Sequence, residues 1–319
     1  MGRVSGKRVV AGPGGRPGRV DVHIGTGSEA VFLDPVGQVV QQRWADAALA
    51  VVFEDLDPVS AFPVVPGRRW GPGLWWSATT GRHVSAGSSA MRAQLMVLDR
   101  DPQVVGLAGR PVRLLWRDGR GRVRSWIPQL FARFADGTAL LADCPGHPAA
   151  GGERAQQAAT AVAQACAQVG FVYRRLPRLE EALAANVKWL AGYRHPRNVG
   201  RPGLMAAVCE AYAEARPLIE GVEAVGDPIE VLPVVFHALW HGQLVTSLET
   251  PLHERAPVSP GPLPHARRAA GLYEGGLDAA AGDHDHEGSR ISREAGGGSG
   301  GPGDGASCGR AGGRGGSAL

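Results

Sequence analysis

The sequence predicts a mixed α/β fold whose core runs helix, three-stranded hairpin sheet, helix, strand, followed by a small helical domain. Three observations lead to this fold class. Three strand-like runs follow one another over 111–144, an amphipathic helical pattern precedes them over 87–98, and a helical segment rich in Ala and Gln follows over 153–168.

The three strands are predicted from apolar runs and the turns between them. The runs cover 111–118, 122–135 and 138–144, and they are separated by Asp118-Gly119 and Asp136-Gly137. An Asp-Gly pair between apolar runs indicates a tight hairpin, because Gly accepts the positive φ that such a turn demands. The segment therefore predicts two consecutive hairpins.

The helices on either side are predicted from spacing and composition. Met91, Leu95 and Leu98 are four and three residues apart, which places them on one face of a helix. The segment 153–168 carries good helix formers and stops shortly before Gly170, a common helix terminator. A fourth strand is predicted over 171–176, which completes the core.

The segments after the core predict more helices. Residues 178–192 form an amphipathic pattern that Gly192 ends. Two or three helices and a short strand, LVTSLETPL, fill 202–254, an order typical of a winged helix. DNA-binding and scaffolding roles both stay open for this part, because its last helix has few Arg or Lys.

Composition sets the domain boundaries. Among 319 residues there are 47 glycines and 24 prolines, and the glycines are concentrated near both ends. Such stretches bury too little apolar surface to fold. We expect a disordered basic arm over 1–35, an α/β domain over 36–198, a winged-helix-like domain over 199–254 and a disordered low-complexity tail over 255–319.

Charge and cysteine spacing narrow the class of protein. The net charge is +4 and the isoelectric point is near 9.1, which permits a nucleic-acid partner. No apolar run is long enough to span a membrane. The four cysteines lie far apart, which argues against a zinc site or a disulfide framework and favours the reducing cytoplasm.

Basic residues beside aromatic ones are the candidate DNA contacts. Trp70, Trp75 and Trp76 precede a basic pair, and aromatic rings beside cations can clamp a nucleic-acid strand, although a Trp-capped edge of the core is the alternative. A second basic group ends the helix of 178–192, where phosphate contacts and a solvated helix terminus are both open. The candidates are Arg82, His83, Lys188, Arg194, His195 and Arg197.

Two short polar signals carry less information. Gly25-Thr26-Gly27 has no third glycine and no helix after it, so it predicts a turn and no nucleotide site. The run Asp283 to Glu287 (DHDHE) has metal-binding side chains, but it lies in the predicted tail, where a chance polar run is the simpler interpretation.

Several longer stretches together resemble one protein family. They are WWSATTGRHV, QLMVLD, DPQVVGLAGRPVRLLW, FARFADG, NVKWLAGYRHPR and EVLPVVFHALWHGQLV. Between about residue 40 and residue 254 the chain resembles the TnsA-like endonuclease subunit of heteromeric transposases. The resemblance implies a restriction-endonuclease-like PD-(D/E)xK core with Mg²⁺, a winged-helix-like domain and cleavage at transposon ends. It also implies transposon-end DNA, a DDE-type transposase and an ATP-dependent regulator as partners, and a nucleoid-associated location.

Only one residue of this chain matches the catalytic pattern of that family. The helix Glu of the family falls on Gly87, and the Glu that often follows one turn later falls on Met91. The Pro-Asp of the second strand falls on Pro128-Gln129. The acid of the third strand is Asp143, and the Lys or Arg two residues later is Pro145. Asp143 is thus the one candidate catalytic and metal-binding residue.

Three functional interpretations stay open at the level of sequence. One carboxylate does not hold Mg²⁺ for hydrolysis, so an active endonuclease needs displaced acids such as Asp99, Asp101 or Glu153. The second interpretation is a catalytically silent subunit that binds DNA and its partners as part of the assembly. The third is a decaying gene product without a function.

Overall fold

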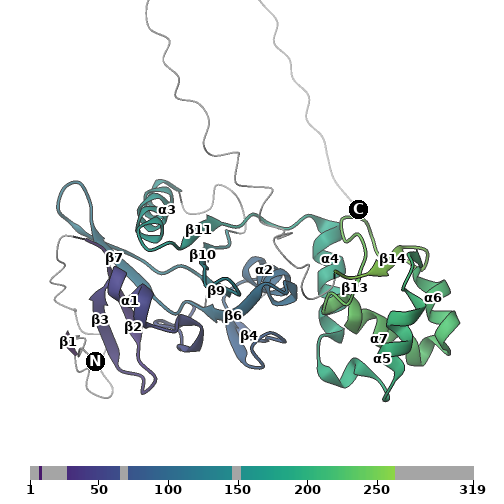
Figure 1. The fold of residues 1–319 in the computed structure, drawn as a ribbon. Coiled ribbons are helices and arrows are strands. Elements are labelled where there is room, and N and C mark those ends of the chain that lie inside the picture. The colour runs from purple at the N-terminus through teal and green to yellow at the C-terminus, as the bar shows by residue number, and fades with distance from the viewer. Residues whose placement is uncertain (1–6, 9–26, 65–70, 146–151, 263–319) are drawn as a thin grey trace, which may run out of the picture. The chain divides into compact units, whose positions relative to one another are not determined.

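The computed structural model describes residues 7–8, 27–64, 71–145 and 152–262. These residues form a mixed α/β structure with seven α-helices and four β-sheets (Figure 1). None of the described helices combines the length and the apolar character needed to cross a membrane. Most of the predicted arm and tail, including Asp283 to Glu287, lies outside the described residues, as does the Gly25-Thr26 part of the predicted turn.

The first sheet has five strands, all antiparallel, in the order β1-β3-β2-β7-β8. Its turns are closed by aspartates: the carboxylate of Asp34 accepts the backbone N–H groups of Val36 and Gln38, and that of Asp118 accepts those of Arg120 and Arg122. The strands are β1 (Lys7–Arg8), β2 (Glu29–Leu33), β3 (Val39–Arg43), β7 (Arg113–Arg117) and β8 (Val123–Trp126).

The second sheet has four strands in the order β11-β10-β9-β6. β6 and β10 both run antiparallel to β9, whereas β11 runs parallel to β10 and is reached through a helix. The strands are β6 (Val104–Gly109), β9 (Leu130–Phe134), β10 (Ala139–Asp143) and β11 (Val172–Arg175), and the helices are α2 (Ser89–Arg100) and α3 (Gly152–Ala167).

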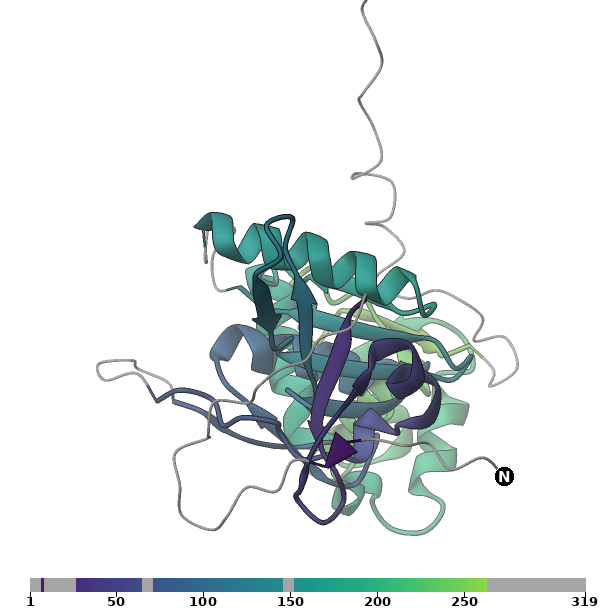
Figure 2. The ribbon, with the colours of Figure 1, turned by 90° about the vertical axis from the view of Figure 1, so that its left-hand side faces the viewer.

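Alternation along these strands buries both faces of the second sheet. Leu130, Ala132, Leu140 and Ala142 share a core with α2, whereas Phe131, Ala139 and Leu141 share a core with α3. Successive strand residues point to opposite faces, so one run of apolar residues serves two helix layers. Figure 2 shows α3 lying across the strands.

The prediction of one strand over 122–135 was wrong. The segment divides at Ile127 to Gln129 into β8, which belongs to the first sheet, and β9, which belongs to the second. Pro128 lies at the break and has no N–H group to continue a ladder. The strand that opens the core is β6, which the sequence did not predict, while 111–118 supplies β7 to the first sheet.

The predicted limits of the folded part, 36 and 254, were too narrow. β2 begins at Glu29, and Ala30 is fully buried. β14 (Pro257–Pro260) lies beyond the predicted end and buries Val258. Both strands are short and border Gly-rich or Pro-rich sequence, which masks their apolar residues.

Smaller elements complete the part of the chain before α2. β4 and β5 form a two-stranded antiparallel sheet, and α1 and a 3₁₀ turn pack beside the first sheet through Trp44 and Phe53. These elements are α1 (Trp44–Ala50), η1 (Phe53–Asp55), β4 (Gly73–Trp76) and β5 (His83–Ala86).

Four helices and a small sheet make up the part after β11. The sheet has the order β12-β14-β13. The elements are α4 (Glu181–Leu190), η2 (Ala191–Tyr193), η3 (Pro196–Val199), α5 (Leu204–Ala211), β12 (Arg216–Pro217), α6 (Leu218–Val225), α7 (Pro228–Trp240) and β13 (Leu244–Val245).

The core of α2 continues without a break into α5, α6 and α7. Trp75 and Trp240 lie with their rings 6.4 Å apart, and Arg100 Nε donates to the carbonyl of Leu239 at 3.2 Å. The residues that the structure describes all belong to one compact unit. Within the described ranges, the buried apolar side chains of 199–254 thus share one core with those of α2, and a domain beginning near residue 199 stays a prediction.

Candidate functional site

Asp143 and Gln129 are brought together at neighbouring ends of β10 and β9. The antiparallel register pairs Ala142 with Leu130, so the residues just beyond this pair face each other. Gln129 N donates to Asp143 Oδ1 at 3.2 Å, and Cys144 N donates to Gln129 Oε1 at 2.9 Å. The two positions thus meet, but the amide oxygen of Gln129 is already bonded.

Asp143 is buried and accepts hydrogen bonds from three donors. Trp126 Nε1 and the Tyr173 hydroxyl both donate to Oδ2 at 2.6 Å, besides Gln129 N on Oδ1. Burial raises the pKa of Asp143, and the bonds from Tyr173 and Trp126 oppose that rise. Both oxygens of the carboxylate are engaged, so a metal would compete with these donors.

Gly87, where the family has its Glu, is closed by an aromatic ring. A Cβ atom on Gly87 would lie 2.0 Å from Cδ1 of Phe62. Gly87 N points to the sulfur of Met91 at 3.4 Å, and the guanidinium of Arg110 lies 4.9 Å from the centre of the Phe62 ring. The ring of Phe62 and the guanidinium of Arg110 therefore lie where the resemblance implies a carboxylate.

The end of β10 carries no basic side chain. Pro145, at the position of the family's Lys or Arg, follows the buried Cys144, and burial together with the charge of Asp143 raises the pKa of that thiol. The pKa of Tyr173 is raised as well, by burial and by Asp143. Both groups stay protonated and neutral at neutral pH, and neither a thiol nor a phenol can carry the positive charge of a Lys or Arg.

The displaced acids do not assemble around Asp143. Asp99 is buried and accepts four bonds, from Trp75 Nε1, Ser77 Oγ and the N–H groups of Ala78 and Thr79. Asp101 accepts Gln103 N within its own turn, and Glu153 is exposed on α3. Within the described ranges, no three His, Cys, Asp or Glu side chains are grouped to hold a metal ion.

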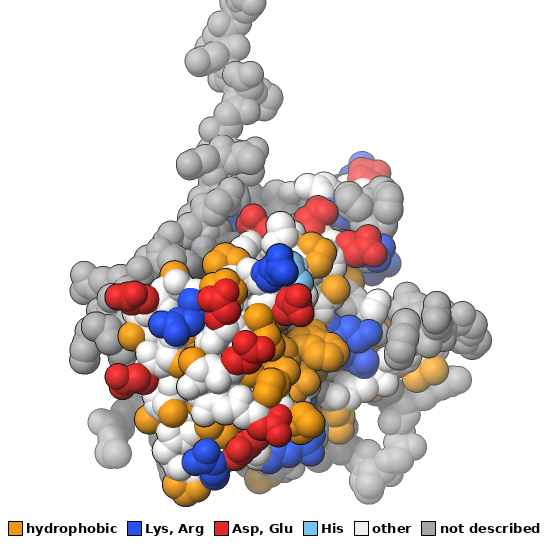
Figure 3. Space-filling view, turned by 90° about the vertical axis from the view of Figure 1, so that its right-hand side faces the viewer, with side chains coloured by type: hydrophobic (Ala, Val, Ile, Leu, Met, Phe, Trp, Pro, Cys, Tyr) orange, Lys and Arg blue, Asp and Glu red, His pale blue; other side chains and the backbone are white. Residues whose placement is uncertain are grey.

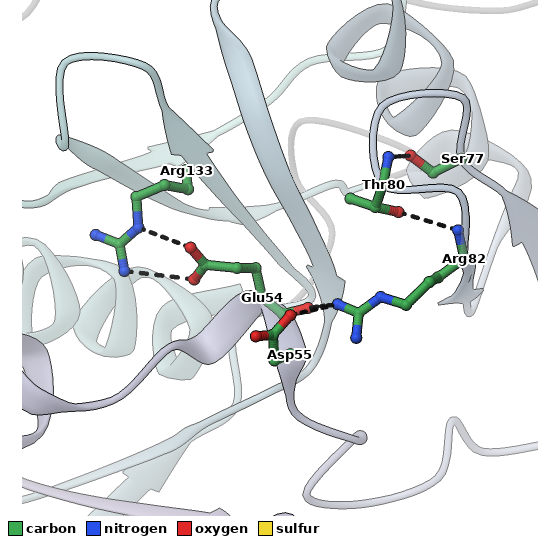
Figure 4. Close-up of polar contacts among 6 residues, drawn as sticks. All are labelled: Glu54, Asp55, Ser77, Thr80, Arg82 and Arg133. Carbon is green, nitrogen blue, oxygen red and sulfur yellow. Dashed lines mark hydrogen bonds and ion pairs between the residues drawn. The ribbon is translucent and has the colours of Figure 1, made fainter.

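Arg82, a candidate DNA contact, is bound to acidic residues of η1 (Figure 4). Its guanidinium donates to Asp55 Oδ1 and to the carbonyl of Glu54, both at 2.7 Å. The Glu54 carboxylate in turn pairs with Arg133 at 3.2 Å. Arg82 and Asp55 are both more than a third exposed, so their pair adds little stability, but it does offset the charge offered to a phosphate.

Arg194, a second candidate, has an internal structural role. Its guanidinium lies 3.9 Å from the centre of the Trp75 ring, and its Nε donates to the carbonyl of Trp76 at 2.9 Å. Burial lowers the pKa of Arg194, and the charge of Asp99 opposes that shift. The structure favours the Trp-capped core as the interpretation of Trp75.

The remaining candidates lie at the surface. His195 Nδ1 accepts Arg197 N at 3.1 Å and so begins η3, while the His195 ring lies 5.0 Å from that of Trp76. Lys188, Arg197 and His83 are exposed. They leave the DNA-contact prediction untested.

A stronger concentration of cations lies on the β7–β8 hairpin, which the sequence analysis missed. Between 113 and 124 the only acid is Asp118, and the cations are Arg113, Arg117, Arg120, Arg122 and Arg124. The signal was visible in the sequence, but the segment was interpreted only as a strand pair.

Comparison of the chain with protein-family models and with curated proteins finds no match.

Proposed function

We propose that this chain is a TnsA-like subunit of a heteromeric transposase that binds DNA and partner subunits without performing metal-dependent strand cleavage. The order of elements supports the fold part of this proposal. With β7 and β8, which belong to the first sheet, left aside, the order α2, β6, β9, β10, α3, β11 gives helix, three strands, helix, strand, and the last strand is parallel to its neighbour after a helical crossover. This is the order that a restriction-endonuclease-like core has.

The part after β11 supports a winged-helix-like arrangement used for protein contacts. Three helices, α5 to α7, are combined with the three-stranded sheet β12-β14-β13. Between 199 and 260 there are eight acidic residues and only three arginines, and Figure 3 shows acidic side chains scattered among apolar ones. An acidic surface repels DNA, so partner subunits are the better match for it.

The observation that carries the non-catalytic part of the proposal is that both oxygens of the Asp143 carboxylate already accept hydrogen bonds. The carboxylate accepts three hydrogen bonds, and Gln129 Oε1 accepts a fourth bond from the backbone. Hydrolysis by Mg²⁺ needs oxygen ligands that are free to coordinate. The expected ligands of this chain already serve the fold.

The test combines nicking and binding by the full chain. Supercoiled plasmid is incubated with Mg²⁺ or Mn²⁺, and binding to a short duplex is measured at several salt concentrations. We expect no nicking above that of Asp143→Ala, together with DNA binding that weakens as salt rises. Nicking that Asp143→Ala abolishes would overturn the non-catalytic assignment. Absence of DNA binding at low salt would overturn the DNA-binding role and would favour the interpretation as a gene product without a function.

A further inference from the structure

An open pocket of about 370 Å³ lies beside Asp143, where the two sheets meet. It is lined by Arg110, Arg113, Ser125, Trp126 and Ile127. Trp126 belongs to β8 and donates to Asp143, so this pocket adjoins the candidate site. Its two charged lining residues are both cations.

Neither of the two arginines forms a close ion pair with a residue that the structure describes. Neither takes part in any of the four ion pairs found there. Arg110 Nη1 donates to the carbonyl of Ala61 at 3.1 Å, but Arg110 Nε and Arg113 Nε are shielded from solvent and have no hydrogen-bond partner within the described segments. A shielded N–H group without an acceptor is unfavourable, so an oxygen-bearing anion would stabilise both.

The charges around Arg110 also favour an anion in the pocket. Burial lowers the pKa of Arg110, and the neighbouring charge of Arg113 lowers it further. The charge of Asp143 acts in the opposite direction and offsets part of this effect. Two arginines next to one carboxylate still leave an excess of positive charge at the pocket.

Arg110 has an unusual backbone conformation. Its φ is 54°, and no other described residue except glycines has a positive φ. The conformation is held by Arg110 N, which donates to the carbonyl of Gln129 at 3.1 Å, and by the Arg110 carbonyl, which accepts Val59 N at 2.9 Å. A strained conformation of a large side chain at a pocket is typical of functional positions.

The surroundings favour a polymer with repeated charges over a single small anion. Ser125 and Trp126 also line a second pocket of about 330 Å³, together with Arg154 and with Arg124, which pairs with Asp118 at 2.8 Å. The side chains of Arg120 and Arg122 are exposed at the tip of the same hairpin. Several cations along one ribbon match the successive phosphates of a nucleic-acid strand.

We propose that the pocket of Arg110 and Arg113 binds a backbone phosphate of DNA, with the β7–β8 hairpin contacting neighbouring phosphates. The proposal rests on the DNA-binding role proposed above and adds the residues that carry it. The planar guanidinium groups bind the phosphate oxygens, and Ser125 adds a hydroxyl donor. Trp126 offers a ring on which a base or sugar can pack.

Arg113→Gln and Arg110→Gly test the proposal in the full chain. Glycine suits a φ of 54°, so Arg110→Gly removes the guanidinium without straining the backbone. We expect each variant to bind a short duplex about tenfold more weakly than the wild type. We also expect the slope of log K against log salt to decrease in size by about 1. Arg255→Gln, an exposed arginine after α7, is the matched control and should leave both quantities unchanged.

Inorganic phosphate, compared with chloride at equal ionic strength, separates the possible outcomes. We expect phosphate to raise the Tm of the wild type and not of Arg113→Gln, and to compete with the duplex. Duplex binding that is equal in wild type and both pocket variants would overturn this inference while the DNA-binding role stands. A phosphate-dependent Tm without duplex binding would overturn the assignment to DNA. If the wild type shows neither a rise of Tm with phosphate nor duplex binding, the site itself is overturned.

Discussion

At the scale of single residues, the candidate site shows how a carboxylate position can be kept for structure. Asp143 joins β8, β9 and β11 through Trp126, Gln129 and Tyr173. A buried charge with several donors stabilises a fold only while all partners are present. Each of these partners is therefore expected to matter for stability.

Tyr173→Phe should lower the free energy of unfolding by about 1 to 3 kcal/mol at neutral pH, because it removes a donor from a buried carboxylate. The folded pKa of Asp143 is raised, so the folded state binds a proton more readily than the unfolded chain. The stability that this group contributes is therefore present at low pH. It is lost as the pH rises from the ordinary pKa of an aspartate through the raised pKa of the folded state. The variant raises that pKa further and should extend the loss to higher pH.

The measurement is denaturant unfolding at mildly acidic and neutral pH. Tyr193→Phe is the matched control, because the Tyr193 ring packs on Phe236 at 4.9 Å and no bond from its hydroxyl is seen within the described residues. An equal effect of both substitutions at every pH would contradict the role of Asp143.

Gly87→Ala tests whether Phe62 closes the position of the family's Glu. The added Cβ would overlap the ring, which should destabilise the fold by about 1 to 3 kcal/mol. Phe62→Ala creates space, so the double variant should be more stable than the sum of the single effects implies. Thermal unfolding of the four proteins gives this coupling, and purely additive effects would show that the ring moves aside freely.

The sequence predicted part of this site and missed the rest for physical reasons. The meeting of Gln129 and Asp143 follows from two neighbouring strands, which their turn residues already indicate. The bonds from Trp126 and Tyr173 to Asp143 depend on the break at Pro128 and on the crossover helix. Neither feature shows in the sequence which side chains will meet. Phe62 lies in a loop far from Gly87 in the chain, and no local pattern connects them.

At the scale of elements, helices were predictable because their signals are local. Met91, Leu95 and Leu98 are all buried on α2, which confirms the expected helix face. The strands were harder, because β6 and β9 pair across β7 and β8, which belong to another sheet. Only the completed topology distinguishes the two sheets.

The N-terminus of α2 supplies a prediction at this scale. Ser88 is the N-cap, and its hydroxyl accepts Met91 N at 3.1 Å. Ser88→Ala should lower the free energy of unfolding by about 1 kcal/mol. Ser89→Ala, one residue along and exposed, should change it by less than about 0.5 kcal/mol. Urea unfolding compares the two, and equal effects would show that the cap contributes nothing.

At the scale of the whole molecule, the described chain is organised around a core that extends from α2 to α7. Leu239 and Trp240 are fully buried in it, together with Leu95 and Leu98. Such a shared core couples the α/β part to the acidic helical part. In the proposed subunit, a partner bound to one part would thereby be connected mechanically to DNA bound at the other.

This continuity predicts a single cooperative unfolding transition for both parts. Leu239→Ala should lower the free energy of unfolding by about 2 to 5 kcal/mol and shift the transition as a whole, because its cavity opens in the shared core. Ile229→Ala on the same helix is the control: Ile229 is 85% exposed, and its loss should have little effect. Amide exchange of α2 gives the independent readout, since Leu239→Ala should accelerate exchange there as well as in α7. Faster exchange confined to α5, α6 and α7, or two separate thermal transitions, would instead support an independent domain beginning near residue 199.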